Sequence, residues 1–452
     1  MKCVIFIPGI MGSELRLKNS NKKVWPPSIF ELTIGGYGRI NELMDPALVA
    51  TRPIVAIGGF YSVYRCILDD IKTCGYTNSG ASGRKFISFP YDWRLSNLET
   101  AQKLATLLDS EDAFDELILI GHSMGGLVLR LLLESGEFDH RPWFNSITRL
   151  ITYGTPHNGA AAALEQVTVG DKTLGVSAAN IKMLASDPRY PSAYQLVPPA
   201  DTALTIKTAG SGQTPEAIDS FDPAIISAFG LKQSNIDAAR AQWAALNIDD
   251  KPAQVDYFSF VGSALKTKYR NDWNGIQLST QERKDSGDGT VPISSAINIR
   301  IPHAFSLKKH ASIFEDRTTR FALYRMLDAP SGVKPMSADT AAEVGDPTAL
   351  GLSVNKESYQ PQDIIEVTVS YVAPQTDPGA NFEIFKLDVE SDEGDRLESV
   401  SEPIKVTFEG AEVDSFTFSI KIDLEPGVYE LRTNRKVDDP GRTLFIVSSV
   451  EE

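Results

Sequence analysis

The chain has 452 residues, and its hydrophobic fraction of 42% with mixed charge is typical of a globular protein large enough for two or three domains. A formal net charge of -15 argues against a nucleic-acid partner and against electrostatic docking on anionic membranes. No apolar run approaches the roughly 18 residues that a membrane-spanning helix needs.

The chain begins with the apolar run 2–7, which predicts a buried core strand. This run is too short for a signal peptide, and no small-residue cleavage site follows it. Cys3, Cys66 and Cys74 are an odd and sparse set of cysteines, so we expect free thiols and a cytoplasmic protein. No cysteine and histidine cluster has the spacing of zinc ligands, and we expect neither a metal nor a cofactor.

Short apolar strands alternate with helical segments through the first 330 residues or so. We expect strands at 2–7, 53–57, 85–89, 117–120, 146–152 and 256–261. A helix at about 99–108 carries apolar residues at helical spacing between two of these strands. This alternation predicts an α/β fold, with a parallel sheet that helices cover on both faces.

The strand at 117–120 is followed by Gly121-His-Ser-Met-Gly125, a G-x-S-x-G pattern, and then by an apolar helix. A serine hydroxyl is a weak nucleophile, so it has to be held on a sharp turn where a base and the substrate can reach its oxygen. The glycines let the strand and the helix approach each other closely around that turn. We therefore expect Ser123 to be a nucleophile; the alternative is an ordinary turn whose serine caps the helix.

Two long segments do not follow the alternation of strands and helices. Residues 160–252 are too many for a loop in a compact sheet protein, and they include a helical segment at 234–246. We interpret them as an inserted lid. Residues 18–50, rich in proline and glycine, are a candidate second insertion. Together with the strands, these segments predict one catalytic domain over 1–330.

The pattern changes after residue 330. Residues 331–349 are interpreted as a linker, and 350–452 as a β-sandwich of immunoglobulin-like type. Its expected strands are 364–371, 382–389, 404–408, 415–422, 427–432 and 443–447. Because this part contains no histidine, we interpret it as an interaction module for a protein partner or as a packing module, with a structural appendage as the alternative.

A serine nucleophile needs a base and an acid that orients the base. In folds with a serine on such a strand-to-helix turn, these follow the serine in the order acid, then histidine, and only His303 and His310 lie late enough. His310 follows an apolar strand and precedes a predicted helix, whereas His303 starts a strand, so we favour His310. For the acid we favour Asp288, between two glycines, over Asp285 and over a plain Asp-Gly turn.

The oxyanion of an acyl-transfer intermediate needs backbone N–H donors. One is expected from Met124, directly after the serine, and another from the glycine-rich loop 8–13 that leaves the first strand. In that loop we favour the N–H of Met11, with Ile10 as the alternative. The loop could instead be an ordinary turn at the end of a strand, with no catalytic role.

Several motifs follow one another in a fixed order from residue 1 to about residue 330. They are Pro8-Gly-Ile-Met-Gly-Ser13, Tyr91-Asp-Trp-Arg94, Gly121-His-Ser-Met-Gly125, Gly154-Thr-Pro-His-Asn-Gly159, Pro191-Ser-Ala-Tyr-Gln-Leu196, Gly287-Asp-Gly-Thr-Val291 and His310. As a set they resemble the lecithin:cholesterol acyltransferase family of α/β-hydrolases.

The resemblance implies that Ser123 forms an acyl-enzyme and that Asp288 and His310 complete its triad, with Met11 and Met124 as the oxyanion donors. The residues implied to border the substrate are Ile10, Tyr91, Trp93, His122, Thr155 and His157. Residues 160–252 would be the lid and the place of any transient contact with a lipid surface. The family acts on acyl esters, typically glycerophospholipids, and passes the acyl group to water or to an alcohol.

The expected function is therefore a serine hydrolase of carboxylic esters, with lipid acyl esters as the expected substrates. A transacylase that uses an alcohol acceptor shares the first half of this reaction and stays an alternative. An amidase or peptidase on the same triad, and a catalytically silent hydrolase fold that serves as an interaction protein, are further alternatives.

Overall fold

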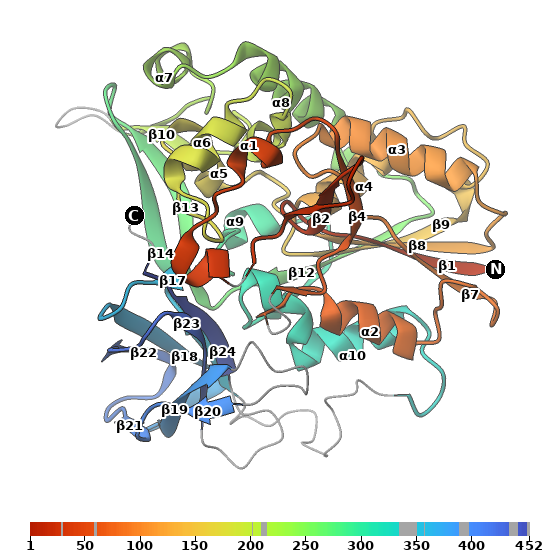
Figure 1. Ribbon diagram of the computed structural model, residues 1–452. Helices are drawn as coiled ribbons and strands as arrows, with labels where there is room; N and C mark the ends of the chain where they lie inside the picture. Colours follow the sequence, from red (N-terminus) through yellow and green to blue (C-terminus); the bar gives the residue numbers. More distant parts are fainter. Residues whose placement is uncertain are drawn as a thin grey trace.

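The computed structural model describes residues 1–28, 30–57, 61–200, 202–208, 215–333, 350–356, 358–387, 397–433 and 442–449. It has a larger α/β part and a smaller C-terminal part made of strands, drawn in blue in Figure 1. The expected linker at 331–349 lies outside the described residues from position 334 onward.

A six-stranded sheet forms the centre of the larger part, in the order β15-β12-β9-β8-β1-β7. Its strands are β1 (Lys2–Ile7), β7 (Arg84–Ser88), β8 (Glu116–His122), β9 (Ile147–Tyr153), β12 (Asp256–Gly262) and β15 (His303–Ser306). Every neighbouring pair is parallel, which confirms the predicted α/β fold with a parallel sheet. Parallel strands all end at one edge of the sheet, so the loops that follow them gather there.

Alternate residues of each strand face opposite layers of helices. In β1, Cys3, Ile5 and Ile7 join one apolar cluster, whereas Val4 and Phe6 join the other. Helices α3 (Asn97–Asp109) and α4 (Met124–Glu134) pack in the first cluster, and α2 (Arg65–Thr73) and α10 (Arg317–Met326) in the second. Figure 1 shows α3 on one side of the sheet and α2 and α10 on the other. Helices therefore bury both faces of the sheet, as expected for strands with continuous apolar runs.

The prediction of a core strand at 53–57 is wrong. Residues 13–62 contain two small antiparallel sheets instead, made of β2 (Ser13–Leu17), β3 (Lys23–Trp25) and β4 (Leu48–Pro53), and of β5 (Ala56–Ile57) and β6 (Tyr61–Ser62). Pro53 ends β4 because it has no N–H for a sheet ladder. Two short helices, η1 (Glu31–Gly35) and α1 (Ile40–Leu43), lie between β3 and β4.

The segment 160–252 contains mostly short helices. They are α5 (Ala161–Thr168), α6 (Ala178–Ala185), η3 (Pro191–Leu196), α7 (Pro223–Phe229), α8 (Gln233–Ala245) and η4 (Ile248–Asp250), with strands β10 (Thr205–Lys207) and β11 (Glu216–Ala217). The helix predicted at 234–246 is α8. Asp222 and Ser177 cap α7 and α6 through their side chains, which is why these helices begin where they do.

A long hairpin, β13 (Leu265–Trp273) and β14 (Leu278–Gly287), was not expected from the sequence. Strand β13 pairs with β10, and β10 pairs with β11, so the four strands form one sheet. The segment 160–252 is therefore hydrogen-bonded to residues that follow it by more than ten positions. β14 is largely exposed along its middle and lacks the apolar alternation that predicts a strand. Helices η2 (Phe144–Ser146), α9 (Ile293–Ala296) and η5 (His310–Glu315) complete this part.

The C-terminal part contains two further sheets around a core of its own. Their strands are β16 (Leu350–Val354), β17 (Ser358–Tyr359), β18 (Ile364–Gln375), β19 (Gly379–Leu387), β20 (Leu397–Ser399), β21 (Ile404–Thr407), β22 (Val413–Lys421), β23 (Gly427–Thr433) and β24 (Arg442–Val447). Apolar side chains of both sheets share one cluster. The predicted β-rich character of this part is confirmed; residues 388–389 of an expected strand lie outside the described residues.

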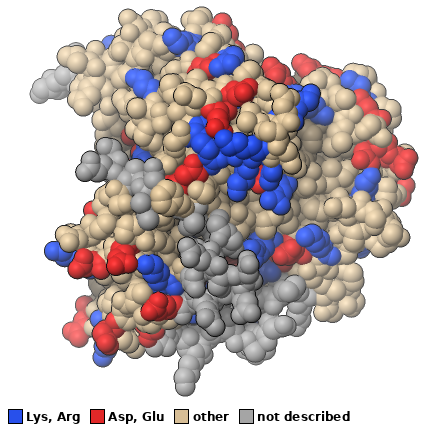
Figure 2. Space-filling view, viewed as in Figure 1, with Lys and Arg blue, Asp and Glu red and all other residues tan. Residues whose placement is uncertain are grey.

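Figure 2 shows acidic and basic side chains interspersed over one face, with one group of Lys and Arg near its centre. Among the described residues, no helix has the length and apolar character needed to cross a membrane.

The three cysteines carry free thiols, in agreement with their spacing in the sequence. Burial raises the pKa of Cys3 and of Cys74 to about 12, and it raises that of Cys66 as well. Because the thiolate is the reactive form, we expect the native protein to react only slowly with an aromatic disulfide reagent at pH 8. Three thiols should titrate at once in guanidinium. Rapid reaction of the native protein would contradict this burial.

Candidate active site

Ser123 occupies the turn between β8 and α4. Its φ of 52° and ψ of -125° lie outside the regions that a residue with a side chain ordinarily adopts. The Ser123 N–H donates to the Tyr153 carbonyl on β9 at 2.8 Å, and the Gly126 N–H donates to the Ser123 carbonyl at 3.0 Å. The side chain does not cap α4. This strained serine has the backbone of a nucleophile elbow, and the helix-cap alternative lacks its hydrogen bond.

Two glycines let neighbouring loops close around this turn. A Cβ at Gly126 would lie 2.0 Å from Thr155 Oγ1, in the loop that follows β9. At Gly9 it would lie 2.8 Å from the Cβ of Ser123 itself. The loops after β1, β8 and β9 therefore meet at the carboxyl edge of the sheet with no room for added side chains.

Asp288 and His310 form a hydrogen-bonded pair. His310 Nδ1 lies 2.7 Å from Asp288 Oδ2, and the His310 N–H donates to the Asp288 carbonyl at 2.8 Å. The other carboxylate oxygen accepts the N–H groups of Thr290 and Val291 at 3.0 and 2.7 Å. Asp288 is 1% exposed. A carboxylate fixed in this way holds the histidine in the tautomer whose Nε2 is free to accept a proton.

Asp285 and His303, the alternatives for the acid and the base, lie elsewhere in the fold. Asp285 lies within β14, and it is Asp288, three positions later, that contacts His310. His303 is the first residue of β15, is exposed, and directs Nδ1 at the carbonyl of Ile301 at 3.2 Å.

Gly154 packs against the Asp288–His310 pair, because a Cβ there would lie 2.9 Å from Asp288 Oδ2 and 3.0 Å from His310 Nδ1. The residue before it, Tyr153, accepts the Ser123 N–H through its carbonyl. Ser123 Oγ and His310 are not hydrogen-bonded to each other in the described structure. Such contacts are often long without substrate and shorten in the reacting complex.

The candidate oxyanion donors come from two segments, helix α4 and the loop after β1. Met124 is the first residue of α4, so its N–H has no partner within the helix. Met11 has a φ of 58°, and its carbonyl accepts the indole N–H of Trp25 at 2.8 Å. A hydrogen bond from the Gly12 N–H to the Gly9 carbonyl at 3.1 Å closes the turn that contains Met11. These bonds leave the Met11 N–H without a partner in the described part of the chain.

Tyr64 and His122 connect three of these loops. The Gly9 N–H donates to Tyr64 Oη at 2.9 Å, and Tyr64 Oη lies 2.9 Å from His122 Nδ1. His122 Nε2 lies 3.1 Å from the carbonyl of His310. A carbonyl only accepts, so Nε2 carries the proton and Nδ1 accepts the tyrosine hydroxyl. Burial lowers the pKa of His122 well below its usual range, which keeps the ring neutral.

The other residues predicted to border the substrate are mostly buried. Trp93 donates its indole N–H to the Ser13 carbonyl at 3.3 Å, and Tyr91 is 3% exposed. His157 uses both ring nitrogens, on Arg130 Nη1 at 3.4 Å and on Ser259 Oγ at 3.1 Å. Thr155 is 2% exposed, whereas Ile10 is half-buried. Direct substrate contact by these residues stays a prediction.

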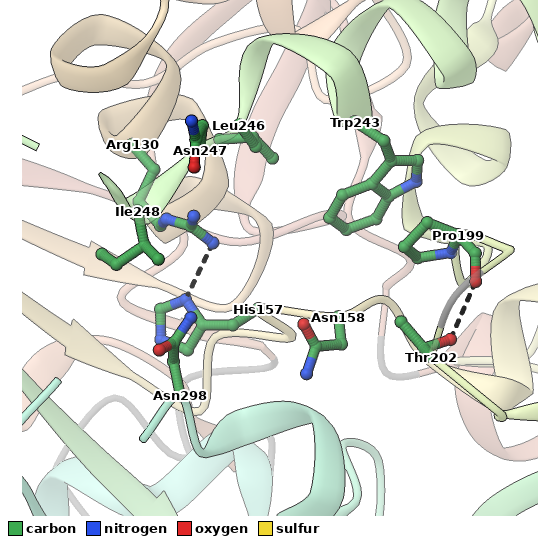
Figure 3. A pocket seen from close by; sticks show the side chains of 10 residues that line it. All are labelled: Arg130, His157, Asn158, Pro199, Thr202, Trp243, Leu246, Asn247, Ile248 and Asn298. Atoms are coloured by element: carbon green, nitrogen blue, oxygen red, sulfur yellow. Dashed lines mark hydrogen bonds between the residues drawn. The ribbon is translucent and has the colours of Figure 1, made fainter. Parts of the chain in front are cut away.

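A cavity of about 440 Å³ adjoins this region. Its walls are Arg130, His157, Asn158, Pro199, Thr202, Trp243, Leu246, Asn247, Ile248 and Asn298 (Figure 3). Arg130 is already paired with Glu134 at 2.7 Å, so its charge is neutralised within the protein. Ser123, Asp288 and His310 are not among the residues that line this cavity.

Sequence reasoning missed Tyr64, whose hydroxyl contacts His122. That His122 borders the substrate stays a prediction. Tyr64 is separated from His122 by 58 positions, and no local pattern marks it. The only available signal was the histidine inside the G-x-S-x-G pattern, whose partners are visible in the tertiary structure alone.

A parallel sheet with a serine elbow after one strand and an aspartate–histidine pair at the same edge defines the α/β-hydrolase class. Residues 33–248 match the family described as lecithin:cholesterol acyltransferase. The resemblance predicted from the motifs is thereby confirmed.

Solved structures that match this chain share little sequence with it. The Tle4-Tli4 complex contains a chain that is 14% identical, with a TM-score of 0.53 over 74% of this chain and 99% of that one. A metagenomic carboxyl esterase is 10% identical, with a TM-score of 0.30 over 68% and 64%. A pyrethroid hydrolase from Sphingobium faniae is 10% identical, with a TM-score of 0.28 over 73% and 98%. The comparison with curated proteins found no match.

Proposed function

We propose that this protein cleaves carboxylic esters, with lipid acyl esters as its substrates, through Ser123, His310 and Asp288. One observation carries the proposal: a serine in a strained elbow lies at the same sheet edge as a buried carboxylate held on a histidine at 2.7 Å. The match to the lecithin:cholesterol acyltransferase family supports acyl esters as the substrate class.

In the proposed reaction, His310 Nε2 accepts the Ser123 hydroxyl proton while Oγ bonds to the ester carbonyl carbon. The carbonyl electron pair moves to its oxygen, where the N–H groups of Met11 and Met124 stabilise the negative charge. The tetrahedral intermediate collapses by breaking the ester C–O bond, and His310 passes its proton to the departing alkoxide. Water then attacks the acyl-enzyme by the same steps and releases the acid.

Acyl transfer to an alcohol is the second candidate, and the family match favours it because the family is described as an acyltransferase. The first half of the reaction is unchanged. In the second half an alcohol hydroxyl gives its proton to His310 and takes the acyl group in place of water.

The proposal also assigns roles to the parts of the chain. Residues 1–330 would be the catalytic domain, and 160–252 its lid. Residues 350–452 would be a sandwich of immunoglobulin-like type. The many short helices of 160–252 and their pairing with the β13–β14 hairpin support a covering element, and the shared core of the two C-terminal sheets supports a sandwich.

Hydrolysis of nitrophenyl esters from acetyl to palmitoyl by the full chain tests this function. We expect turnover that rises with chain length and falls by at least about 10³-fold in Ser123→Ala, because no second nucleophile replaces the serine. Ser135→Ala, at the far end of α4, is the matched control and should keep full activity. A fluorophosphonate probe should label the native protein and not Ser123→Ala.

Each outcome separates the candidates. Faster nitrophenol release on addition of a long-chain alcohol, with formation of its ester, would identify a transacylase. Activity confined to short esters would remove lipids as substrates, and faster cleavage of matched amides would point to an amidase. Full turnover by Ser123→Ala, or no turnover together with no labelling by the probe, would overturn the proposal.

A further inference from the structure

The six-stranded sheet of the C-terminal part, β17-β24-β23-β19-β20 with β21 beside β19, has buried apolar side chains on both faces. In β24, Phe445 and Val447 belong to the core of the C-terminal part, but Ile446 belongs to the core cluster of the catalytic part. Val428 on β23 and Leu387 on β19 point the same way as Ile446 and join the same cluster. Alternate residues of a strand face opposite sides, so one face of this sheet packs within its own part and the other on the catalytic part.

This contact reaches the turn that carries His310. Lys309 Nζ donates to the carbonyl of Leu444 on β24 at 3.2 Å. On that side of β24, β17 pairs only with Ile446 and Val447, so Leu444 lies beyond the end of its neighbour among the described strands. An edge carbonyl of this kind needs a donor, and the lysine before the candidate catalytic histidine supplies it.

A second contact joins the end of the C-terminal part to helix η1 of the catalytic part. The Ser449 N–H donates to the carbonyl of Thr33 in η1 at 2.9 Å, and Leu32 of the same helix is 3% exposed in the shared cluster. Figure 1 shows the blue C-terminal strands beside the lower end of β14. The C-terminal part thus touches two segments of the catalytic part, and one of them is the histidine turn itself.

Within the catalytic part, the His310 backbone is held by Asp288 through its N–H and by His122 through its carbonyl. The contact of Lys309 with Leu444 is a further tether on the same turn, and it comes from the C-terminal sheet. A displacement of about 1 Å in a reacting group can cost about a hundredfold in rate.

We propose that the C-terminal sheet positions His310 for proton transfer, and that Lys309 is the positioning residue through which it acts. This inference rests on the proposed function of the triad. It assigns a role in catalysis to the C-terminal part, which was expected to be an interaction or packing module.

The test compares Lys309→Met with Lys308→Met in the full chain. Both variants lose one positive charge near His310, but no contact between the two parts is made by the Lys308 side chain among the described residues. We expect Lys309→Met to lower kcat and the rate of fluorophosphonate labelling about tenfold, with KM and the thermal unfolding midpoint unchanged. Lys308→Met should stay within about twofold of the native kcat, and Lys309→Arg should restore most of the activity.

A second pair of variants tests the sheet itself. Ile446→Ala opens a cavity at the contact with the catalytic part, whereas Leu431→Ala opens one inside the C-terminal core. Near-ultraviolet circular dichroism selects a temperature at which both variants are folded. There we expect a lower kcat in Ile446→Ala alone.

A native kcat in Lys309→Met overturns the positioning role, whatever Ile446→Ala shows. If Ser123→Ala is inactive in the same assay, that result removes only the positioning role and leaves the proposed function standing. If Ser123→Ala keeps its turnover, the proposed function itself fails.

Discussion

Replacement of Asp288 by asparagine is expected to lower kcat about 10⁴-fold while the fold is retained. The carboxylate accepts His310 Nδ1–H at 2.7 Å and two backbone N–H groups, so it fixes the tautomer that leaves Nε2 ready for the Ser123 proton. An asparagine amide has nearly the same shape. It can present an N–H to the ring, which favours the opposite tautomer and removes the base. Steady-state kinetics with a nitrophenyl ester measures the loss.

Asp285→Asn is the matched control, since Asp285 is the carboxylate nearest to Asp288 in the sequence and lies within β14. We expect its kcat to stay within about threefold of the native value, because Asp288 is the residue that contacts His310. If Asp285→Asn lost activity and Asp288→Asn kept it, the acid would be misassigned. Circular dichroism of both variants shows whether the fold is intact.

Replacement of Arg320 by methionine is expected to lower the free energy of unfolding by about 3–5 kcal/mol. Arg320 Nε and Nη2 both lie 2.7 Å from Asp70, and Tyr324 Oη donates to the same carboxylate at 2.9 Å. This group joins α2 to α10 beside the second apolar cluster, with Asp70 2% exposed. Removing the arginine leaves a buried carboxylate without its counter-charge. Urea unfolding followed by tryptophan fluorescence measures the change.

Two comparisons identify the cause of this loss. Lys72→Met breaks an exposed pair with Asp69 on the same helix and should change the free energy of unfolding by less than about 0.5 kcal/mol. The triple variant Asp70→Leu, Arg320→Met and Tyr324→Phe removes the whole polar group. It should recover most of the lost stability, because no buried charge remains. Equal destabilisation by the single and triple variants would argue that packing, and not the unpaired carboxylate, explains the effect.

The central sheet and the strained turn at Ser123 were predictable because their signals are local. The run 2–7 alternates between two apolar faces, and β1 occupies those residues. The serine elbow was marked by a strand, two glycines and an apolar helix in direct succession. Strand 53–57 failed for the same reason: five apolar residues resemble a core strand locally, but their partner strands are antiparallel and close by.

The rest of the candidate site depends on contacts between residues far apart in the chain. The order of serine, acid and histidine narrowed the choice to Asp288 or Asp285, and to His310 or His303. The tertiary structure brings Asp288 and His310 together and leaves the other two elsewhere.

The sequence by itself determined the parallel sheet, the elbow at Ser123 and the β-rich C-terminal part. Each of these follows from the pattern of apolar and turn residues within a short stretch of the chain. Only the tertiary structure decided which side chains surround the elbow. Tyr64 reaches His122, the β13–β14 hairpin pairs with β10, and Lys309 reaches Leu444 across 135 positions. Such contacts are made by packing and by the need of buried polar groups for partners, and no short stretch of sequence contains both members of the pair.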